Sequence, residues 1–388
     1  MPLLVSYSLK NAFARKLTGT LTVAGIALVV FVFCAVLMLA NGLEQTLADT
    51  GSDKNVIAVR KSANTELVSI LSRADADIIK SDPAIVREAD GSPRFTGEVL
   101  ALIGLAKKSD SNMVNVNVRG GSAASFIVRP AVKIVQGRTY RPGSSEIIIG
   151  SKVAKGYWGA GQGERLKFGG RDWTIVGIFE AAGSGFESEV WVDCDQLGAA
   201  FNWPTFSSLT FQIAPGTDFV ALKNRLESDQ RLTVEIMPEK EYYRKQSAAF
   251  TTFVRVLGMF IAIVFSLGAV VGAMITMYGA VANRTIEIGT LRALGFRRSS
   301  VLFAFMAESL FISGVGGLIG IALASLLRFL EISTTNFDTF SEIAFSFKMS
   351  PQIAIQAIIF SLLMGLIGGF LPAVRAARVR IVNALKAR

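Results

Sequence analysis

The 388-residue chain contains no histidine and only two cysteines, Cys34 and Cys194. The lack of histidine excludes Ser-His-Asp triads, the usual zinc sites and imidazole proton relays. Cys34 lies within a long apolar run and Cys194 in a region of mixed composition, so we expect no disulfide between them. The chain also lacks the GxxxxGK[ST] phosphate-binding loop. These absences disfavour an enzyme, and they predict no catalytic residue and no metal site in this chain.

Charged residues are scarce as well, at 18% of the chain, whereas 51% of residues are hydrophobic and the mean hydropathy is +0.46. This composition is typical of a membrane protein. A helix needs about 20 mostly apolar residues to cross the bilayer. The predicted transmembrane helices are residues 18–43, 251–282, 301–328 and 351–374. The first apolar run is longer than the apolar core of a signal peptide, which has about 7–15 residues, so we interpret it as an uncleaved anchor.

The net charge of +10 is confined to the regions around these helices. Residues 44–245 contain 25 basic and 25 acidic side chains, so the whole excess lies outside that segment. Most of the excess basic residues fall in the ranges 10–16, 284–298 and 375–388. By the positive-inside rule these ranges and both termini are cytoplasmic, whereas residues 44–250 and the loop 329–350 are external. Charge distributed in this way indicates no nucleic-acid partner.

The segment 44–250 has the pattern of a folded α+β domain. Short strand-like runs alternate with turn signals, at residues 55–60, 113–119, 146–150, 165–180, 189–193, 208–214 and 232–237. Gly169 and Gly170 predict a tight hairpin turn, and helical patterns occur at 66–81, 193–202 and 218–229. The predicted fold is an α-helical membrane domain of four transmembrane helices with a large extracytoplasmic α+β domain, of one or two lobes, inserted between the first and second helices.

Residues 283–300 connect the second and third predicted transmembrane helices. The pattern predicts a helix from about Asn283 to Leu294 with Ile286, Thr290, Ala293 and Leu294 on one side, and Gly295 is suited to the position after its end. Two interpretations remain open. The segment is either a loop that only fixes the topology or a helix that docks on a cytoplasmic partner.

Two features of the third predicted transmembrane helix require an explanation. Glu308 is an acid within an apolar run, and an unpaired carboxylate there would be costly. We interpret it as a structural residue paired with Arg292, Arg297 or a backbone amide, with proton coupling as the alternative. The glycines at 314, 316, 317 and 320 predict close contact with a neighbouring helix or with a second copy of the chain.

Several stretches together resemble the MacB/FtsX-like family of ABC-transporter permeases. IEIGTLRALGFRRSSVLFAFMAESLFISGVGGLIG (286–320) resembles the family's signature region, and SLKNAFARKLTGTLTVAGIALVV (8–30) its amphipathic elbow and first transmembrane helix. Residues 146–193 resemble the MacB-type periplasmic core domain, and LPAVRAARVRIVNALKAR (371–388) the cytoplasmic tail. The tail departs from the family at Val379-Arg380-Ile381, where members commonly have a Leu-Asp-Pro-like turn.

The resemblance implies a role for each segment. Residues 1–17 would be the cytoplasmic elbow, 44–250 a periplasmic MacB-type core domain with a stalk, 283–300 the coupling helix and 375–388 the cytoplasmic tail. The implied ATPase-coupling residues are Arg284, Glu287, Ile288, Arg292, Leu294 and Gly295. No cofactor is expected on this chain, because ATP and Mg would be bound by a separate cytoplasmic ABC ATPase.

The implied function is that of a permease subunit in a bacterial inner membrane, with both termini in the cytoplasm. Two copies, or one copy with a homologous permease, would transmit the movement of the ATPases to the periplasmic domains by mechanotransmission. This movement would drive efflux or extrusion of a drug, peptide, lipid or lipoprotein. The implied partners are the ATPase, the second permease and membrane lipids, with a periplasmic adaptor as a further candidate. The alternative is an FtsX-like, non-transporting regulator that activates a periplasmic cell-wall hydrolase.

Overall fold

The computed structural model describes residues 16–336 and 339–381, and the chain divides into two compact units. The membrane unit comprises Met1–Gly42, Thr252–Leu330 and Ser346–Arg388, and the sheet unit comprises Leu43–Thr251 and Glu331–Phe345. Almost all of the predicted elbow, residues 1–17, lies outside the described residues, as does the end of the predicted tail, residues 382–388.

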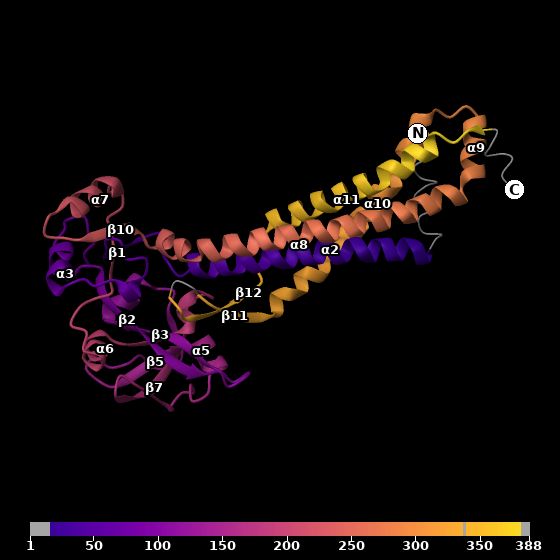
Figure 1. Cartoon of the computed structure of the whole chain (residues 1–388). Helices are drawn as coiled ribbons and strands as arrows, with labels where there is room; N and C mark the ends of the chain where they lie inside the picture. Colours follow the sequence, from indigo (N-terminus) through magenta and orange to yellow (C-terminus); the bar gives the residue numbers. More distant parts are fainter. Residues whose placement is uncertain (1–15, 337–338, 382–388) are drawn as a thin grey trace. The chain divides into compact units, whose positions relative to one another are not determined.

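Four helices of the described chain are long and apolar enough to cross a membrane. They are α2 (Lys16–Ala48), α8 (Glu239–Asn283), α10 (Arg298–Ser325), which the short 3-10 helix η3 (Leu326–Phe329) extends, and α11 (Pro351–Ala377). A short helix, α9 (Thr285–Ala293), lies between α8 and α10 (Figure 1). Each predicted transmembrane segment lies within one of the four long helices. The helix α8 is uninterrupted over 45 residues. The boundary between the units falls within it, and its first turns belong to the sheet unit.

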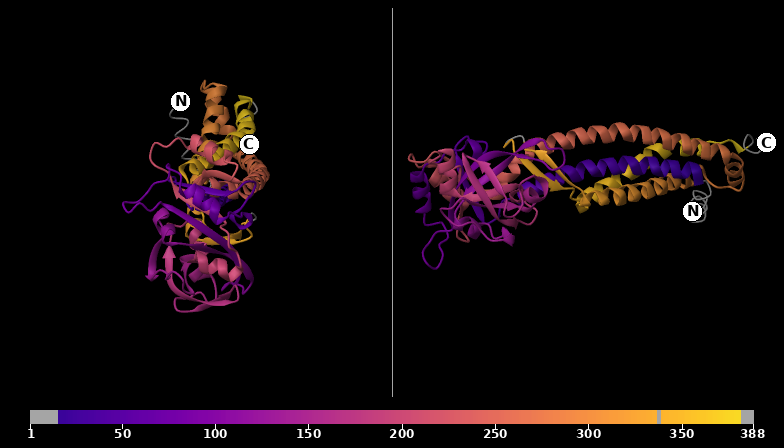
Figure 2. Two further views of the ribbon diagram at one scale, coloured as in Figure 1. Left: turned by 90° about the vertical axis from the view of Figure 1, so that its left-hand side faces the viewer. Right: turned by 90° about the horizontal axis from the view of Figure 1, so that it is seen from below.

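Small residues on α10 allow α2 to approach closely, and the long helices run alongside one another (Figure 2). A Cβ atom added at Gly316 would lie 3.0 Å from Cβ of Ile26, and one added at Gly320 would lie 2.6 Å from the carbonyl oxygen of Ala27. Glycines at such positions let the helix backbones come together. Of the two contacts expected for these glycines, the structure shows the one with a neighbouring helix of the same chain.

The sheet unit is built on a ten-stranded sheet with the order β10-β1-β9-β2-β3-β8-β5-β7-β4, in which β6 also pairs with β7. The strands are β1 (Asn55–Arg60), β2 (Phe95–Ala106), β3 (Met113–Gly121), β4 (Lys133–Gly137), β5 (Glu146–Gly150), β6 (Arg165–Phe168), β7 (Arg171–Glu180), β8 (Glu189–Asp193), β9 (Ser208–Gln212) and β10 (Val234–Pro238). The pairs β3–β8 and β5–β7 are parallel, and the other pairs are antiparallel. All seven predicted strand segments contain strands, and the predicted hairpin turn at Gly169 and Gly170 is confirmed.

The long strand β2, which the sequence pattern did not predict, connects the two halves of this sheet. Its residues 95–98 pair with β9, and its residues 99–106 pair with β3. One hydrophobic cluster forms around β1, β9 and β10, and another around β2, β3, β5, β7 and β8. A third cluster combines residues of β1 and β10 with residues of β5, β7 and β8, so the two halves lie on one continuous sheet and are not separate lobes.

Short helices complete the sheet unit. They are η1 (Glu66–Val68), α3 (Arg73–Lys80), α4 (Ala123–Val128), α5 (Ser151–Gly156), η2 (Gly185–Ser188), α6 (Cys194–Phe201) and α7 (Phe219–Ser228). The helices α6 and α7 lie within the segments predicted as helical. The segment 66–81 forms η1 and α3 instead of one helix, because Leu71 leaves the helix to pair with Phe206.

The segment between η3 and α11 was predicted only as a loop, but it contains a hairpin of β11 (Glu331–Thr335) and β12 (Glu342–Ser346). The hairpin contacts other parts of the sheet unit, to which nearly all of it belongs. Glu342 forms an ion pair with Lys107 and accepts a hydrogen bond from the hydroxyl of Tyr157. The Nζ of Lys152 donates to the carbonyl oxygen of Ala344 at 2.9 Å.

Candidate functional site

The helix α9 presents an exposed face within the membrane unit. Ile286 is 54% exposed and Leu294, immediately after the helix, is 73% exposed. Glu287, Thr290 and Ala293 are exposed as well. Positions 286, 290 and 293 recur at helical spacing, so they share one side of the helix. We call these five residues the α9 face.

The opposite side of α9 is anchored in the membrane unit. Ile288 is 2% exposed, and it belongs to a cluster with residues of α8, α10 and α11. The other buried members of this cluster are Met277, Val281, Val301, Phe305, Ala373 and Ala376. Burying an isoleucine side chain is worth about 1.5–3 kcal/mol. This packing holds α9 against three of the long helices while its outer face stays open.

An ion pair fixes the start of α9. The Nη1 of Arg284 donates to Oε2 of Glu308 at 3.0 Å, and both residues are buried. Glu308 therefore pairs with Arg284, which was not among the predicted partners Arg292, Arg297 and a backbone amide. A paired carboxylate agrees with a structural role, since the positive charge offsets the cost of burial.

A glycine ends the helix. Gly295 has φ +95°. Its N–H donates to the carbonyl oxygen of Arg292 at 3.2 Å, and the N–H of Phe296 donates to the carbonyl oxygen of Leu291 at 3.2 Å. These two bonds form a Schellman motif, which requires the left-handed conformation that glycine adopts without strain. The position predicted for Gly295 from the sequence is confirmed.

The six residues predicted to couple to an ATPase do not all lie on one surface. Glu287 and Leu294 are on the α9 face, whereas the side chains of Arg284 and Ile288 point into the membrane unit. Arg292 is partly buried, and its Nε has no hydrogen-bond partner among the described residues. The predicted list omitted the exposed Ile286, Thr290 and Ala293, although their helical spacing had already grouped them with Leu294.

The anchoring ion pair leads to a prediction. Glu308→Gln leaves Arg284 buried without its charged partner, and breaking a buried pair in this way costs about 3–5 kcal/mol. We expect the detergent-solubilised variant to aggregate at a lower temperature than the wild type, measured by size-exclusion chromatography after heating. The double variant Arg284→Met with Glu308→Met removes both charges and should recover most of the loss. Equal heat resistance of Glu308→Gln and the wild type would show that the pair does not anchor α9.

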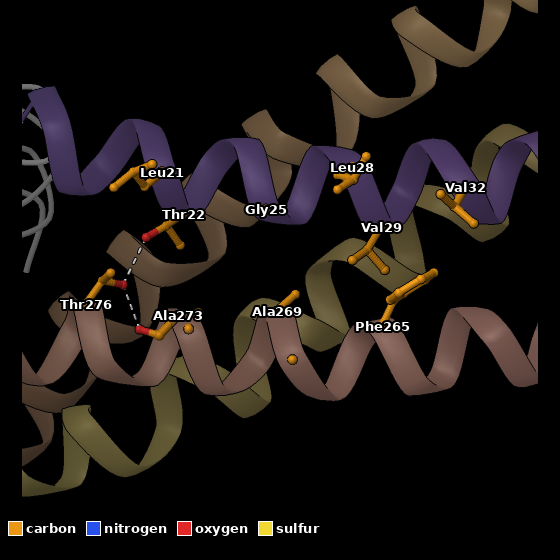
Figure 3. A pocket seen from close by; sticks show the side chains of 12 residues that line it. Leu21, Thr22, Gly25, Leu28, Val29, Val32, Phe265, Ala269, Ala273 and Thr276 are labelled. Carbon is orange, nitrogen blue, oxygen red and sulfur yellow. Dashed lines mark hydrogen bonds between the residues drawn. The ribbon is translucent and has the colours of Figure 1, made fainter.

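A second feature of the membrane unit is an apolar groove between α2 and α8, with a volume of about 510 Å³. Figure 3 shows Leu28 and Val29 of α2 and Phe265 of α8 along its walls. Near one end, the hydroxyl of Thr22 donates to that of Thr276 at 2.9 Å. The groove offers apolar contacts and almost no polar chemistry. Within residues 16–336 and 339–381, no cluster of three or more Cys, Asp or Glu side chains is arranged to hold a metal ion.

Two family models match the chain. The model described as the MacB-like periplasmic core domain matches residues 20–229, and the one described as the FtsX-like permease C-terminal matches residues 259–381. The second match contains α9, the Arg284–Glu308 pair and most of the membrane unit. The first match covers more than half of the chain and contains most of the sheet unit.

Individual proteins agree with these matches. The "Uncharacterized ABC transporter permease YknZ" of Bacillus subtilis is 24% identical over 98% of this chain and 98% of its own length. The "Macrolide export ATP-binding/permease protein MacB" of Bdellovibrio bacteriovorus is 22% identical over 96% of this chain, which spans 60% of that protein. MacB of Brucella melitensis is 25% identical over 97% of this chain, which spans 59% of its length. The chain thus spans less than two thirds of these MacB relatives.

Solved structures similar to the chain include the periplasmic region of MacB from Actinobacillus actinomycetemcomitans, with a TM-score of 0.38 and 14% identity. That match covers 51% of this chain and 94% of the solved one. The extracellular domain of YknZ gives a TM-score of 0.35 at 14% identity, over 47% of this chain and 99% of the solved one.

Proposed function

The chain belongs to the MacB/FtsX-like family of ABC-transporter permeases, and we propose that it is a permease subunit driven by a separate cytoplasmic ATPase. The observation that carries this proposal is the α9 face. It is an exposed, largely apolar side of a helix whose other side is anchored to α8, α10 and α11. Such a helix suits a groove in a partner protein, which would bury its apolar residues.

The anchoring suggests how movement of the ATPase would pass through this chain. A shift of α9 would act directly on α8 and α10, because Ile288 packs on both and Arg284 is paired with Glu308 of α10. The helix α8 continues without a break to Glu239 in the sheet unit. ATP-driven movement at α9 would therefore reach the sheet unit by mechanotransmission, without a substrate path through the membrane unit.

The proposed membrane topology, location and assembly are those expected for the family. We propose that the sheet unit is extracytoplasmic, that both termini and α9 are cytoplasmic, and that the chain acts in the bacterial inner membrane as a dimer or with a homologous permease. The MacB relatives are named for macrolide export, and we propose export as the function of this chain as well. An FtsX-like regulatory function would use the same α9 contact and would differ in the partner of the sheet unit.

The test is ATP hydrolysis in lipid nanodiscs. The purified chain alone is expected to hydrolyse no ATP, because its sequence has no phosphate-binding loop. The chain with its ABC ATPase should form a stable complex that hydrolyses ATP, and a catalytically inactive ATPase serves as the control. Hydrolysis by the chain alone, or an ATPase that never associates with it, would contradict the proposal.

A further inference from the structure

Six charged side chains lie together in the interior of the sheet unit. They are Glu66, Glu98, Arg119, Arg129, Glu189 and Glu239, and none is more than 5% exposed. We call them the buried charge network. Its members come from η1, β2, β3, the residue after α4, β8 and the first position of α8. The network therefore joins elements from both halves of the sheet to the start of α8.

Arg119 is the centre of the network. Its Nη1 and Nη2 donate to the carboxylate of Glu66 at 2.8 and 3.1 Å, and its Nε and Nη2 donate to Glu189 at 2.8 and 3.0 Å. A further bond from Nη1 reaches Glu98 at 2.9 Å. All five N–H donors of the guanidinium are thus directed to carboxylates. A planar group held at five points fixes the relative positions of η1, β2, β3 and β8.

Arg129 extends the network to α8. It pairs with Glu98, and its Nε and Nη2 donate to Oε1 of Glu239 at 3.1 and 2.9 Å. The other oxygen of Glu239 accepts from the backbone N–H of Ser52 at 2.9 Å and from Nδ2 of Asn55 at 2.7 Å. Four hydrogen bonds from three segments therefore hold the first residue of α8.

The end of α2 is attached to the same region. The N–H of Gly185 donates to Oγ1 of Thr50 at 2.8 Å, and Thr50 lies two residues after Ala48, the last residue of α2. The next residue, Phe186, places its ring under both guanidiniums, 5.2 Å from that of Arg119 and 4.8 Å from that of Arg129. The Thr50–Gly185 hydrogen bond thus connects the segment after α2 to this region, and charge-assisted bonds hold Glu239 at the start of α8.

Small cavities adjoin this region within the sheet unit. One of about 20 Å³ and one of about 30 Å³ are both lined by Leu47 near the end of α2, Gln246 of α8 and Ile343 of β12. Interiors are otherwise packed as tightly as organic crystals. The cavity of about 20 Å³ is also lined by Glu66, Arg119 and Glu189, so it lies directly beside the buried charge network.

Stability alone gives no reason for such a network. Buried ion pairs are often no more stabilising than apolar residues of the same shape, because removing the charges from water is costly. Hydrogen-bonded charges do, however, fix geometry in a way that apolar contacts do not. We propose that the buried charge network is a rigid joint that makes both halves of the sheet and the start of α8 move as one body. In the transport cycle of the proposed function, Glu239, Arg129 and Arg119 would act as positioning residues.

The experiment measures distances between spin labels in the full chain in nanodiscs. One label is placed near the start of α8 at Lys245→Cys, and the second at Val220→Cys in one half of the sheet unit or at Lys155→Cys in the other; all three residues belong to the sheet unit and are exposed. Cys34 and Cys194 are buried and should stay unlabelled, which the parent chain checks. In the wild type we expect a narrow distance distribution for both pairs.

Glu239→Gln is the decisive variant. Each carboxylate oxygen of Glu239 accepts two hydrogen bonds, and glutamine replaces one of these oxygens by an NH2 group, which cannot accept. Two hydrogen bonds are therefore lost, while the volume of the side chain is kept. We expect both distributions to broaden, and the fraction of chains at the wild-type distance to fall about tenfold, as for a lost coupling between sites. The control is Leu222→Ala, which opens the core beside α7 without touching the network. The distance distributions of this control should stay narrow even though its sheet unit is less stable.

Narrow distance distributions in Glu239→Gln would contradict the proposal that the network is a rigid joint. Distributions that are already broad in the wild type would contradict it as well. Broadening in Leu222→Ala to the same extent would overturn it too, because the network would then contribute only stability. The inference rests on the proposed function for its place in the transport cycle. Binding of the ATPase is measured on the same samples, so a failure of the proposed function appears separately from a failure of the joint.

Discussion

Aspartate at both Ile286 and Leu294 should weaken binding of the ATPase about 100-fold or more, while the chain remains folded. Both side chains are exposed, so the substitutions should cost the free chain little stability. In a complex, each would place a charge in an apolar contact, and losing one well-packed contact at the centre of an interface costs about 2 kcal/mol or more. The measurement is the affinity of the ATPase for the chain in nanodiscs, by biolayer interferometry.

The matched control is Ser299→Asp. Ser299 is exposed in the first turn of α10, so the variant adds a negative charge close to α9 but outside the α9 face. A helix N-terminus tolerates an anion, because the helix dipole is positive there. The control should bind the ATPase as the wild type does. Wild-type affinity in the double variant would mean that α9 is only a topological loop.

Replacing Arg119 by methionine should strongly destabilise the sheet unit. The substitution leaves Glu66, Glu98 and Glu189 buried without the guanidinium that binds all three. Breaking one buried pair already costs about 3–5 kcal/mol, a large part of the roughly 5–15 kcal/mol that stabilises a typical domain. All four tryptophans of the chain lie in the sheet unit, so urea unfolding followed by tryptophan fluorescence measures this unit. We expect the variant to unfold at much lower urea concentration.

Arg138→Met is the control for this prediction. Arg138 also pairs with a glutamate, Glu146, but its side chain is 45% exposed. Surface pairs contribute about 0–1 kcal/mol, so the urea midpoint should hardly change. An Arg119→Met variant as stable as this control would contradict the assigned role of the network.

The pH dependence should differ in sign between the wild type and Arg119→Met. Burial alone would raise the pKa of Glu66, but the charge and hydrogen bonds of Arg119 hold it below its ordinary value. A carboxyl with a lowered pKa stabilises the fold above its unfolded pKa, about 4.3, and this contribution is lost as pH falls through the folded value. Without Arg119 the pKa of Glu66 should rise, so mild acid should stabilise the variant. A urea midpoint that falls equally in both proteins would contradict this account.

Features set by local sequence could be predicted. The end of α9 depends on a glycine placed directly after a helical pattern, and the predicted Gly295 adopts the conformation that such an end requires. The strand β7 follows an alternating pattern and a two-glycine turn, so its hairpin with β6 was also predictable. The four long helices follow from length and composition alone. In each case the information lies within about 10 to 25 neighbouring residues.

Features set by contacts between distant residues could not be predicted. Arg119 ends an alternating run and reads as the polar end of a strand, yet it is 1% exposed because Glu66 and Glu189 come from other elements. The strand β2 changes its partner after Glu98, and it has no regular alternation because many of its consecutive residues are buried. The partner of Glu308 was missed because the candidates considered lay close to the third helix, whereas Arg284 lies before α9.

The central claim is that α9 binds the ATPase, and site-specific photo-crosslinking in native membranes tests it most directly. A benzophenone amino acid replaces Leu294 on the α9 face or, in a second sample, the exposed Ala282 near the end of α8. We predict a covalent adduct with the ATPase from position 294 that disappears when Ile286 is also replaced by aspartate, and little or none from position 282. No adduct from position 294, or equal adducts from both positions, would contradict the account.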